Sequence, residues 1–397
     1  MNYNFPDKIK GNQVSLIRYV AERGMKIPGF ISFALGNPAK ESIPVELLQK
    51  CSSNVFSEDP MSVLQYGPST GDAALSAWVR ERVITKKGCP EEGHKVMLLT
   101  GSGKALGYIP RALCSEGDEA FCDSFTFPNA YNSMRNAGVI PVGIPHDEKG
   151  MIPAQLEKQA MRGRGKYIYL IPNFHNPLGM TMPLDRRKEL YEIACKYNLI
   201  IYEDDPYGDI RFSGEEVPTI KSLDTDGRVI YVGSFSKTLS AGLRVGFLYA
   251  ADELVQAISK VKGSDGQDPL YNQKIIMKCL QNMDYDEHLK KISLIYKHKC
   301  DLMVENLKKY CDPACRILVP EGGMFVWIEM PEEIDINAVS EKCLQAGVGV
   351  VKSEAFAVDA SYPGHAFRLN FSACEDKNIE KGVRIFGQIT KESVQEI

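Results

Sequence analysis

The segment 234–246, which reads SFSKTLSAGLRVG, carries several reactive groups at close spacing. It supplies the amine of Lys237, the hydroxyls of Ser234 and Ser236 and the guanidinium of Arg244. An amine forms a Schiff base with an aldehyde, and hydroxyl and guanidinium groups bind phosphate well. The segment therefore predicts a site for a phosphorylated aldehyde cofactor. A surface lysine beside a structural arginine is the alternative interpretation.

Three other polar segments each follow a predicted strand. Asn176 lies in the turn 172–179 (PNFHNPLG), and Asp204 and Tyr207 lie in the loop 202–207 (YEDDPY). Asn-Pro turns and acidic loops are common at strand ends, so both segments also have a purely structural interpretation. The third segment, residues 100–106 (TGSGKAL), follows a strand and opens a predicted helix, and backbone amides at such a helix start favour phosphate binding. Its candidate phosphate contacts are the amides of Ser102, Gly103 and Lys104.

Three familiar signatures nearly match and fail. The Gly-Lys pair at 103–104 resembles the end of a nucleotide-binding loop, but Leu98 stands at the required glycine and Ala105 at the required hydroxyl. The same loop lacks the third glycine of GxGxxG, because Leu106 occupies that position. The segment 234–237 fits the SxxK motif of penicillin-binding hydrolases, but the chain contains neither SDN nor KTG.

The elements that must position these groups are indicated by short apolar runs between residues 95 and 249. Such runs, without alternation, suit strands that are buried on both faces. The stretches between them, such as 183–197, have helical spacing. Strands that alternate with helices predict a mostly parallel sheet covered by helices. The six runs cover residues 96–99, 120–122, 139–142, 167–171, 199–202 and 229–232.

The pattern changes after Asp284. A long charged amphipathic stretch over 286–310 predicts a helix, and strand-like and helix-like segments follow it to the C-terminus. We expect a smaller α+β domain there, with the first 45 or so residues packed on it because they lack the strand–helix alternation. The predicted division is a large cofactor-binding domain over 46–284, and an N-terminal arm plus small C-terminal domain over 1–45 and 285–397.

Composition excludes several classes of protein. The 397 residues include 47 basic and 51 acidic ones, for a net charge of −4, whereas a nucleic-acid binder usually carries a basic excess. No run of about 18 apolar residues and no signal-peptide core is visible, so we expect neither a membrane partner nor export. Eleven cysteines and six histidines form no metal-ligand spacing, so no metal site is expected. Reduced thiols in the cytoplasm are the expected state.

Taken together, these segments resemble the fold-type I pyridoxal-phosphate-dependent class I and II aminotransferases. The segment 234–246 is similar to the family motif S-x-S-K-x-x-x-P-G-L-R-x-G, with Ala241 in place of the proline. The N-P-x-G turn and the Asp-x-x-Tyr pair precede it in the order of the family. The resemblance spans residues 15–372. It implies an aspartate-aminotransferase-like α/β fold, whose large domain has a mostly parallel seven-stranded sheet between helices, plus a smaller α+β domain.

This resemblance implies pyridoxal 5'-phosphate as the cofactor. Lys237 would hold it as a Schiff base and move a proton as general base and acid. Asp204 would keep the pyridinium nitrogen protonated, which makes the ring an electron sink, while Asn176 and Tyr207 bond the ring oxygen. The other implied contacts are ring stacking by Phe127, phosphate binding by Ser102, Gly103, Lys104, Ser234, Ser236 and Arg244, and Tyr66 reaching the phosphate of the neighbouring subunit. A buried core side chain is the alternative for Phe127.

Substrate-binding groups are implied near both ends of the chain. Arg368 matches the arginine that binds the substrate α-carboxylate as a bidentate fork, a role that lysine fills poorly. Gly36 matches a backbone position that closes over the same carboxylate. Asn176 is also implied to bind the substrate. Arg18 is the candidate for meeting an acidic substrate side chain, with a solvated helix arginine as the alternative.

The resemblance is closest to the subgroup of α-aminoadipate, kynurenine and multi-substrate aromatic aminotransferases. It rests on residues 15–18, 29–33, 65–71 and 320–325. The segment 352–356 reads KSEAF where this subgroup often has PGxxF, and Leu35 replaces a frequent glycine. Both departures lie on the expected substrate side, so the identity of the amino donor does not carry over.

The implied activity is transfer of an amino group from an L-amino acid to a 2-oxo acid, with 2-oxoglutarate expected, by a ping-pong mechanism in a homodimer. Two alternatives stay open. A pyridoxal-phosphate β-lyase of the same fold would use the same cofactor residues and differ only in its products. A cofactor-sensing regulatory domain fused to a DNA-binding module is the other. It is not expected, because the chain starts directly with the aminotransferase-like arm and has no basic patch.

Overall fold

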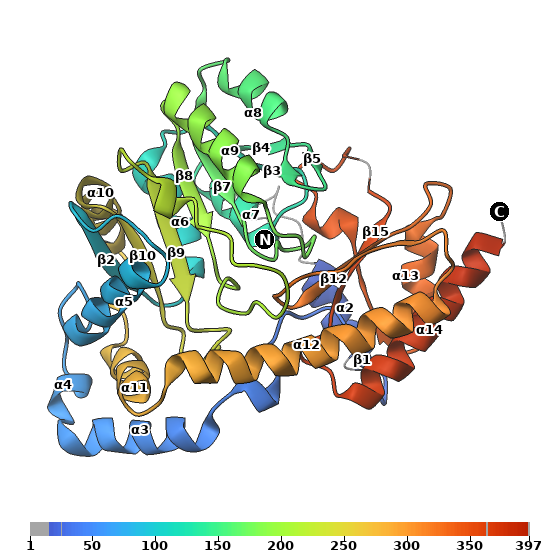
Figure 1. Ribbon diagram of the computed structural model, residues 1–397, viewed down its shortest axis with the longest axis horizontal. Helices are drawn as coiled ribbons and strands as arrows, with labels where there is room; N and C mark the ends of the chain where they lie inside the picture. Colours follow the sequence, from blue (N-terminus) through green and yellow to red (C-terminus); the bar gives the residue numbers. More distant parts are fainter. Residues whose placement is uncertain (1–15, 25, 363, 396–397) are drawn as a thin grey trace, which may run out of the picture.

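A seven-stranded β-sheet, here called the large sheet, forms the centre of the described part of the chain (Figure 1). The computed structural model describes residues 16–24, 26–362 and 364–395. Neighbouring strands pair in parallel, except that β10 is antiparallel to both β2 and β9. This confirms the predicted α/β class with a mostly parallel sheet. The strands in spatial order are β2 His94–Leu99, β10 Gly246–Ala251, β9 Val229–Ser234, β8 Ile200–Asp204, β7 Gly165–Leu170, β3 Glu119–Asp123 and β4 Ile140–Ile144.

Each of the six predicted apolar runs falls on one strand of the large sheet. All five residues of β3 are buried, as expected for a strand covered on both faces. The seventh strand, β10, was not among the predicted runs. Its first residue, Gly246, passes close to the loop after β2, where an added Cβ would lie 2.4 Å from the backbone nitrogen of Ser102. Glycine is therefore required for this close approach of two backbones.

Helices cover both faces of the large sheet (Figure 1). Ile109 of α6 clusters with Ile230 of β9 on one face, and Leu190 of α9 clusters with Ile201 of β8 on the other. Burying such side chains stabilises the fold by about 1.5–3 kcal/mol each. The first face carries α6 Gly103–Leu113, α7 Pro128–Asn136 and α10 Asp252–Gly263, and the second carries α5 Ala73–Thr85, α8 Pro153–Ala160 and α9 Leu184–Lys196.

A second, antiparallel sheet of four strands, here called the small sheet, is built from described residues after position 315. The helices α13 Ile336–Gln345 and α14 Asp376–Gln395 share its hydrophobic core. The N-terminal segment contacts the same unit, because β1 Ile31–Ser32 pairs in parallel with β13 Val348–Gly349 and α2 Leu16–Gly24 lies against β13. The strands of the small sheet, in order, are β11 Arg316–Leu318, β12 Phe325–Glu329, β15 Ala366–Asn370 and β14 Val351–Lys352.

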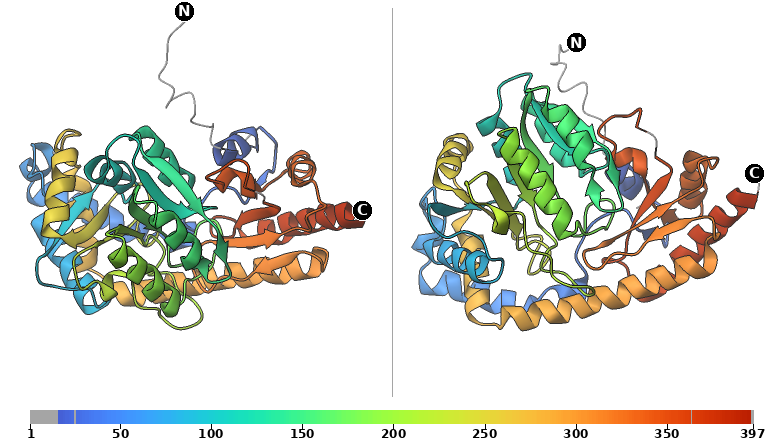
Figure 2. Two further views of the ribbon diagram at one scale, coloured as in Figure 1. Left: turned by 90° about the horizontal axis from the view of Figure 1, so that it is seen from above. Right: turned by 45° about the horizontal axis from the view of Figure 1, so that its top comes forward.

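The helix α12 Tyr285–Tyr310 extends alongside both sheets (Figure 2). The carboxylate of Asp284 caps its first turn by accepting a hydrogen bond from the Glu287 nitrogen at 3.0 Å, and two lysines occupy its last turn. The Tyr285 hydroxyl donates to Thr238 Oγ1 at 2.8 Å, while the later turns pack along α14. One helix thus joins the loop after β9 to the C-terminal unit.

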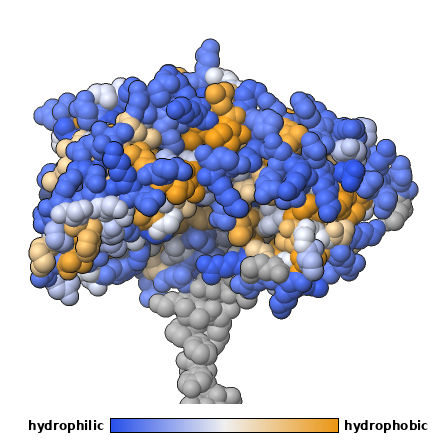
Figure 3. Space-filling model, turned by 90° about the horizontal axis from the view of Figure 1, so that it is seen from below, coloured by the Kyte–Doolittle hydropathy of each residue, from blue (hydrophilic) through white to orange (hydrophobic). Residues whose placement is uncertain are grey.

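The remaining elements are α3 Val45–Glu58, α4 Met61–Leu64, α11 Leu270–Gln281, β5 His146–Asp147, β6 Gly150–Met151 and short 3-10 turns at Lys40–Ser42, Lys221–Leu223 and Ser353–Phe356. Hydrophilic side chains predominate on the face seen from below, with separate hydrophobic patches (Figure 3). Within the described ranges, no helix combines the length and apolar composition that crossing a bilayer requires. The same residues contain no group of three potential metal-binding side chains.

Candidate active site

A cavity of about 300 Å³ lies where the parallel strands of the large sheet end. Such sheet edges, beyond the carboxyl ends of the strands, are the usual ligand sites of open α/β folds. The loops after β2, β3, β7, β8 and β9 supply most of its walls, and Phe325 and Arg368 come from the small sheet. Of the fifteen predicted site residues, twelve line this cavity within the described chain: Gly36, Ser102, Gly103, Phe127, Asn176, Asp204, Tyr207, Ser234, Ser236, Lys237, Arg244 and Arg368.

The Lys237 amine lies deep in this cavity. Its Nζ donates a hydrogen bond to the Gly36 carbonyl oxygen at 2.7 Å, so residues 201 positions apart meet here. Burial, together with the positive charges of Arg244 and Arg368, lowers the pKa of the Lys237 amine to about 8. A tenth of the amines are then unprotonated near pH 7, by the definition of a pKa, and only that form attacks an aldehyde.

One end of the cavity is suited to an anion. Ser102 and Gly103 stand at the N-terminus of α6, where free backbone amides and the helix dipole favour negative charge. Nothing lies within 4 Å of where a Gly103 Cβ would be, so the space beside it is open. Arg244, whose φ of 53° is unusual for a non-glycine residue, donates from Nη1 to Ser236 Oγ at 3.3 Å. Gly101 makes room for this guanidinium, because a Cβ there would lie 2.3 Å from Arg244 Nη2.

Asp204 presents an incompletely paired carboxylate at the end of β8. Its Oδ2 accepts a hydrogen bond from the Tyr169 hydroxyl at 2.8 Å, whereas its Oδ1 is buried and has no partner among the described residues. Burial raises the pKa of the Asp204 carboxyl to about 7, a shift that the Tyr169 hydrogen bond opposes. A buried acceptor without a partner is costly, and a cationic donor in the cavity would satisfy it. Tyr207 also lines this part of the cavity, and burial raises the pKa of its phenol.

Arg368 is 2% exposed and faces the cavity from the small sheet. Its Nη1 donates to Asn176 Oδ1 at 2.8 Å and its Nη2 donates to the Ala34 carbonyl, while the Phe325 ring centroid lies 4.2 Å from the guanidinium carbon. Burial lowers the pKa of Arg368 to about 10. In the described part of the chain, no carboxylate forms an ion pair with it. A buried guanidinium without a counter-ion is suited to an anionic ligand.

Three predicted site residues do not line the cavity. Lys104 is exposed with its Nζ 6.0 Å from the centroid of the Tyr108 ring, and Tyr66 is 90% exposed. Arg18 is an exposed residue of α2, whereas its neighbour Ile17 does line the cavity. Ser15, which begins the motif 15–18, lies outside the described residues.

Sequence reasoning missed the residues that shape the cavity without supplying reactive groups. Tyr169 was missed too, although a tyrosine at the end of a buried strand is a signal, because such a hydroxyl requires a partner. The apolar lining carries no such signal, since its side chains resemble any core residue. The missed lining residues include Ile17, Leu106, Asn129, Ile171, Pro206 and Phe325.

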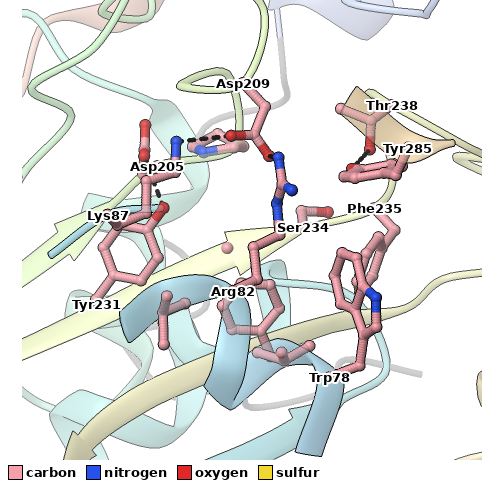
Figure 4. A pocket seen from close by; sticks show the side chains of 15 residues that line it. Trp78, Arg82, Lys87, Asp205, Asp209, Tyr231, Ser234, Phe235, Thr238 and Tyr285 are labelled. Carbon is pink, nitrogen blue, oxygen red and sulfur yellow. Dashed lines mark hydrogen bonds and ion pairs between the residues drawn. The ribbon is translucent and has the colours of Figure 1, made fainter. Parts of the chain in front are cut away.

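A second cavity is lined by Ser234 and Phe235, at the end of β9, and by Thr238 (Figure 4). It measures about 30 Å³, which is room for roughly one water molecule and not for a cofactor. Asp205 faces it and accepts hydrogen bonds from the Tyr231 hydroxyl at 2.8 Å and from Asn173 Nδ2 at 2.9 Å. Arg82, stacked 4.7 Å from the Tyr285 ring, closes the opposite wall. The first cavity is therefore the candidate site.

Comparisons with known proteins agree on one family. The sequence model described as "Aminotransferase class I and II" matches residues 29–386. The aromatic-amino-acid aminotransferase 1 of Thermococcus litoralis is 35% identical, over 98% of this chain and 95% of its own. The crystal structure of the multiple substrate aminotransferase of Thermococcus profundus superposes with a TM-score of 0.93 at 34% identity, covering 99% and 98% of the two chains.

The α-aminoadipate aminotransferase LysN of Thermus thermophilus is also similar, with a TM-score of 0.90, 30% identity and coverage of 99% and 98%. That structure contains N-(5'-phosphopyridoxyl)-L-leucine. The cavity of the present chain fits such a phosphopyridoxyl group. Open space beside Gly103 and the Arg244 guanidinium suit a phosphate, and the unpaired Asp204 Oδ1 suits a protonated ring nitrogen. The chain accordingly belongs to the class I and II aminotransferase family, and it is a transaminase that uses pyridoxal 5'-phosphate.

Proposed function

We propose that this transaminase takes the amino group of an L-amino acid and passes it to 2-oxoglutarate in a ping-pong reaction. The observation that carries the proposal is the placement of the Lys237 amine in the same cavity as the buried Arg368 guanidinium, which has no carboxylate partner among the described residues. Amino and oxo acids share an α-carboxylate, so each can use this guanidinium in turn while its reactive carbon lies within reach of the amine.

The roles we propose follow from the contacts of these residues. When bound, pyridoxal 5'-phosphate supplies an electron sink for the negative charge that develops at the substrate α-carbon. Lys237 would hold the cofactor through its amine, and the freed amine would take the proton from the substrate α-carbon as general base and return it as general acid. Arg368 binds the α-carboxylate, and its bond to Asn176 Oδ1 fixes the fork. In the structure the free Lys237 Nζ donates to the Gly36 carbonyl, and this contact would hold the amine in the cavity for an incoming aldehyde.

The proposed site residues divide into groups. Ser102, Gly103, Lys104, Ser234, Ser236 and Arg244 would bind phosphate, with Lys104 acting through its backbone. Asp204 would pair with the ring nitrogen, and Asn176 and Tyr207 would bond the ring oxygen. Phe127 lines the cavity and would stack on the ring.

The lowered pKa of Lys237 predicts how cofactor capture depends on pH. Below pH 8 the neutral fraction of the amine rises about tenfold per pH unit, and above it the fraction saturates. We expect cofactor-stripped protein to trap pyridoxal 5'-phosphate, measured as the borohydride-stable adduct, with a rate that rises to about pH 8 and then levels. The Lys237→Ala protein gives the background from other lysines. A rate that keeps rising to pH 10 would show an amine of ordinary pKa.

The walls of the cavity favour an amino donor with an apolar side chain, because α2 contributes Ile17 to them. We expect Ile17→Ala to lower kcat/KM for leucine about tenfold while alanine changes less than twofold, since the lost methylenes are worth about 1–3 kcal/mol to a side chain that reaches them. Equal losses for leucine and alanine would contradict a side-chain contact.

Arg18→Ala tests the acidic subsite separately. A selective loss for glutamate would support it, and no selective loss would exclude it.

A homodimer in which Tyr66 reaches the phosphate of the neighbouring site is part of the proposal. Tyr66 is 90% exposed, and Met61 and Leu64 close by are 62% and 64% exposed. Several large apolar side chains exposed near one another favour an interface with another chain. Analytical ultracentrifugation of the wild-type protein should find a dimer. The Tyr66→Phe protein should bind the cofactor more weakly and still be a dimer.

We also propose the division into a large domain over 46–284 and a second unit over 1–45 and 285–397. The pairing of β1 with β13 supports it, since it joins the N-terminal arm to the C-terminal unit. Localisation in the cytoplasm is proposed because all eleven cysteines are free, and reduced thiols suit that compartment.

A half-reaction screen tests the proposed function. The purified yellow protein is mixed with single amino acids, and the loss of its aldehyde absorbance identifies the donors. Adding 2-oxoglutarate should restore the absorbance and yield glutamate in stoichiometric amount. Release of ammonia and pyruvate from a β-substituted amino acid, without an acceptor, would indicate the lyase reaction instead.

A further inference from the structure

A buried ion pair outside the cavity holds the loop that forms the anion-binding end. Asp268 Oδ2 lies 2.6 Å from Lys262 Nζ, and the two side chains are 8% and 5% exposed. Asp268 Oδ1 accepts from the Thr100 nitrogen at 3.0 Å and also from the Thr100 hydroxyl. Thr100 directly precedes Gly101 and Ser102, so this carboxylate fixes the start of the loop that leads into α6.

The ammonium of the same pair reaches a second loop. Besides forming this ion pair, Lys262 Nζ donates hydrogen bonds to the carbonyl oxygens of Leu98 and Ser69, each at 3.0 Å. These two hydrogen bonds fix the ammonium on both carbonyls, while its charge faces the Asp268 carboxylate. Ser69 belongs to the loop 65–71, which also carries Tyr66. One ion pair therefore ties the end of β2, the phosphate loop and the Tyr66 loop together.

The chain after Asp268 strengthens the hold on the Tyr66 loop. Gln273 Oε1 accepts from the Asp72 nitrogen at 2.7 Å, just beyond that loop. At Gly67 a Cβ would lie 3.0 Å from a Leu270 side-chain carbon, so the loop runs close against α11. Neither member of the ion pair is among the residues that line the cavity.

We infer that Lys262 and Asp268 are positioning residues that couple two cofactor sites. Within its own protomer the pair sets the phosphate loop, and through the Tyr66 loop it sets the hydroxyl that this protomer lends to its partner. Buried ion pairs add little net stability, and a role in fixing one arrangement of the chain is their best-attested use. The trans half of the inference rests on the dimer contact proposed above.

The sign of the effect of Asp268→Asn separates positioning from electrostatics. Removing a negative charge near an anion site would, by Coulomb attraction alone, tighten the binding of a phosphate. Positioning predicts the reverse, because asparagine cannot serve both Thr100 and the Lys262 ammonium as a carboxylate does. We expect full-length Asp268→Asn protein to bind pyridoxal 5'-phosphate about tenfold more weakly and pyridoxal, which lacks the phosphate, within twofold of wild type.

Two further variants guard this test. Asp265→Asn is the matched control, because Asp265 lies in the same segment but pairs at the surface with Arg111 at 3.5 Å, and it should bind both compounds like wild type. Thr100→Val removes only the hydroxyl and should weaken phosphate-dependent binding about threefold even if Asp268→Asn fails to fold. Tighter or unchanged binding of pyridoxal 5'-phosphate by both loop variants, or equal weakening for pyridoxal, would overturn the inference.

Hybrid dimers separate the two halves. In a dimer with Lys237→Ala in one protomer, only the other site holds the cofactor covalently, and its loss is followed by absorbance. Asp268→Asn should speed that loss when it is placed in either protomer. When Asp268→Asn and Tyr66→Phe are both placed in the Lys237→Ala protomer, their effects on the loss should not add. If Tyr66→Phe acts but Asp268→Asn in that protomer does not, the trans half is overturned. If Tyr66→Phe itself has no effect, the trans half and the proposed dimer contact fail together, while the homodimer measurement still decides the cis half.

Discussion

Lys237→Ala is expected to abolish turnover, with a loss of at least about 10⁴-fold in kcat. The substitution removes the amine that we propose holds the aldehyde and carries the proton from the α-carbon, and general acid–base catalysis alone is worth about 10²–10⁴-fold. Turnover is measured with the best donor from the half-reaction screen. Borohydride reduction followed by peptide mass analysis should find the phosphopyridoxyl group on Lys237 in the wild type.

Lys260→Ala serves as the control for Lys237→Ala. Lys260 is an exposed lysine of α10 on the same chain and should retain wild-type turnover. A small primary amine such as methylamine should restore part of the lost rate, because it can carry the proton in solution. If Lys237→Ala kept full turnover without any added amine, the proposed mechanism would be wrong.

Asp204→Asn is expected to lower kcat/KM about a thousandfold. The neutral amide cannot keep a ring nitrogen protonated, and losing one partner of a buried charged pair costs about 3–5 kcal/mol. Without a cationic partner, burial holds the pKa of the Asp204 carboxyl at about 7, so at pH 8 the carboxylate form predominates and is ready to pair. The measurement is kcat/KM for the best donor at pH 8, with cofactor content determined by absorbance.

Tyr169→Phe is the matched variant for Asp204→Asn, because it keeps the carboxylate and removes only the hydroxyl that donates to its Oδ2. Losing one hydrogen bond to a charged group should cost about 1.5–3 kcal/mol, so we expect a loss between about tenfold and about 150-fold. A thousandfold loss in both variants would assign the effect to the hydrogen-bond network. Retention of activity within tenfold in Asp204→Asn would show that the charge is not needed.

The sequence predicts best the features that have a local signal. Each apolar run became a strand because a β-branched segment between Gly, Pro or Asp has few other ways to be buried. The segment 286–310 became α12 within one residue of its predicted bounds. Motif residues such as Lys237, Asp204 and Asn176 meet in one cavity, because strand ends in a parallel sheet share an edge.

What the sequence could not predict depends on contacts between distant segments. β10 runs antiparallel between β2 and β9, and nothing in its six residues specifies those neighbours. Ile17 resembles any apolar residue of an amphipathic helix until the cavity shows what it faces. The Lys262–Asp268 pair joins residues that look like ordinary surface charges, and only the fold reveals that both are buried.

The Arg368 guanidinium has a consequence for the kinetics of the whole enzyme. Donor and acceptor both carry an α-carboxylate, and in the proposed role of Arg368 both dock on this one buried fork. The two substrates therefore exclude each other, so no complex with both bound contributes to the steady state. An acceptor in excess binds to the form of the enzyme that awaits the donor, and it thereby slows the reaction of the donor. Inhibition by high concentrations of 2-oxo acid, relieved by more amino acid, is thus built into a cavity with a single receptor for carboxylates.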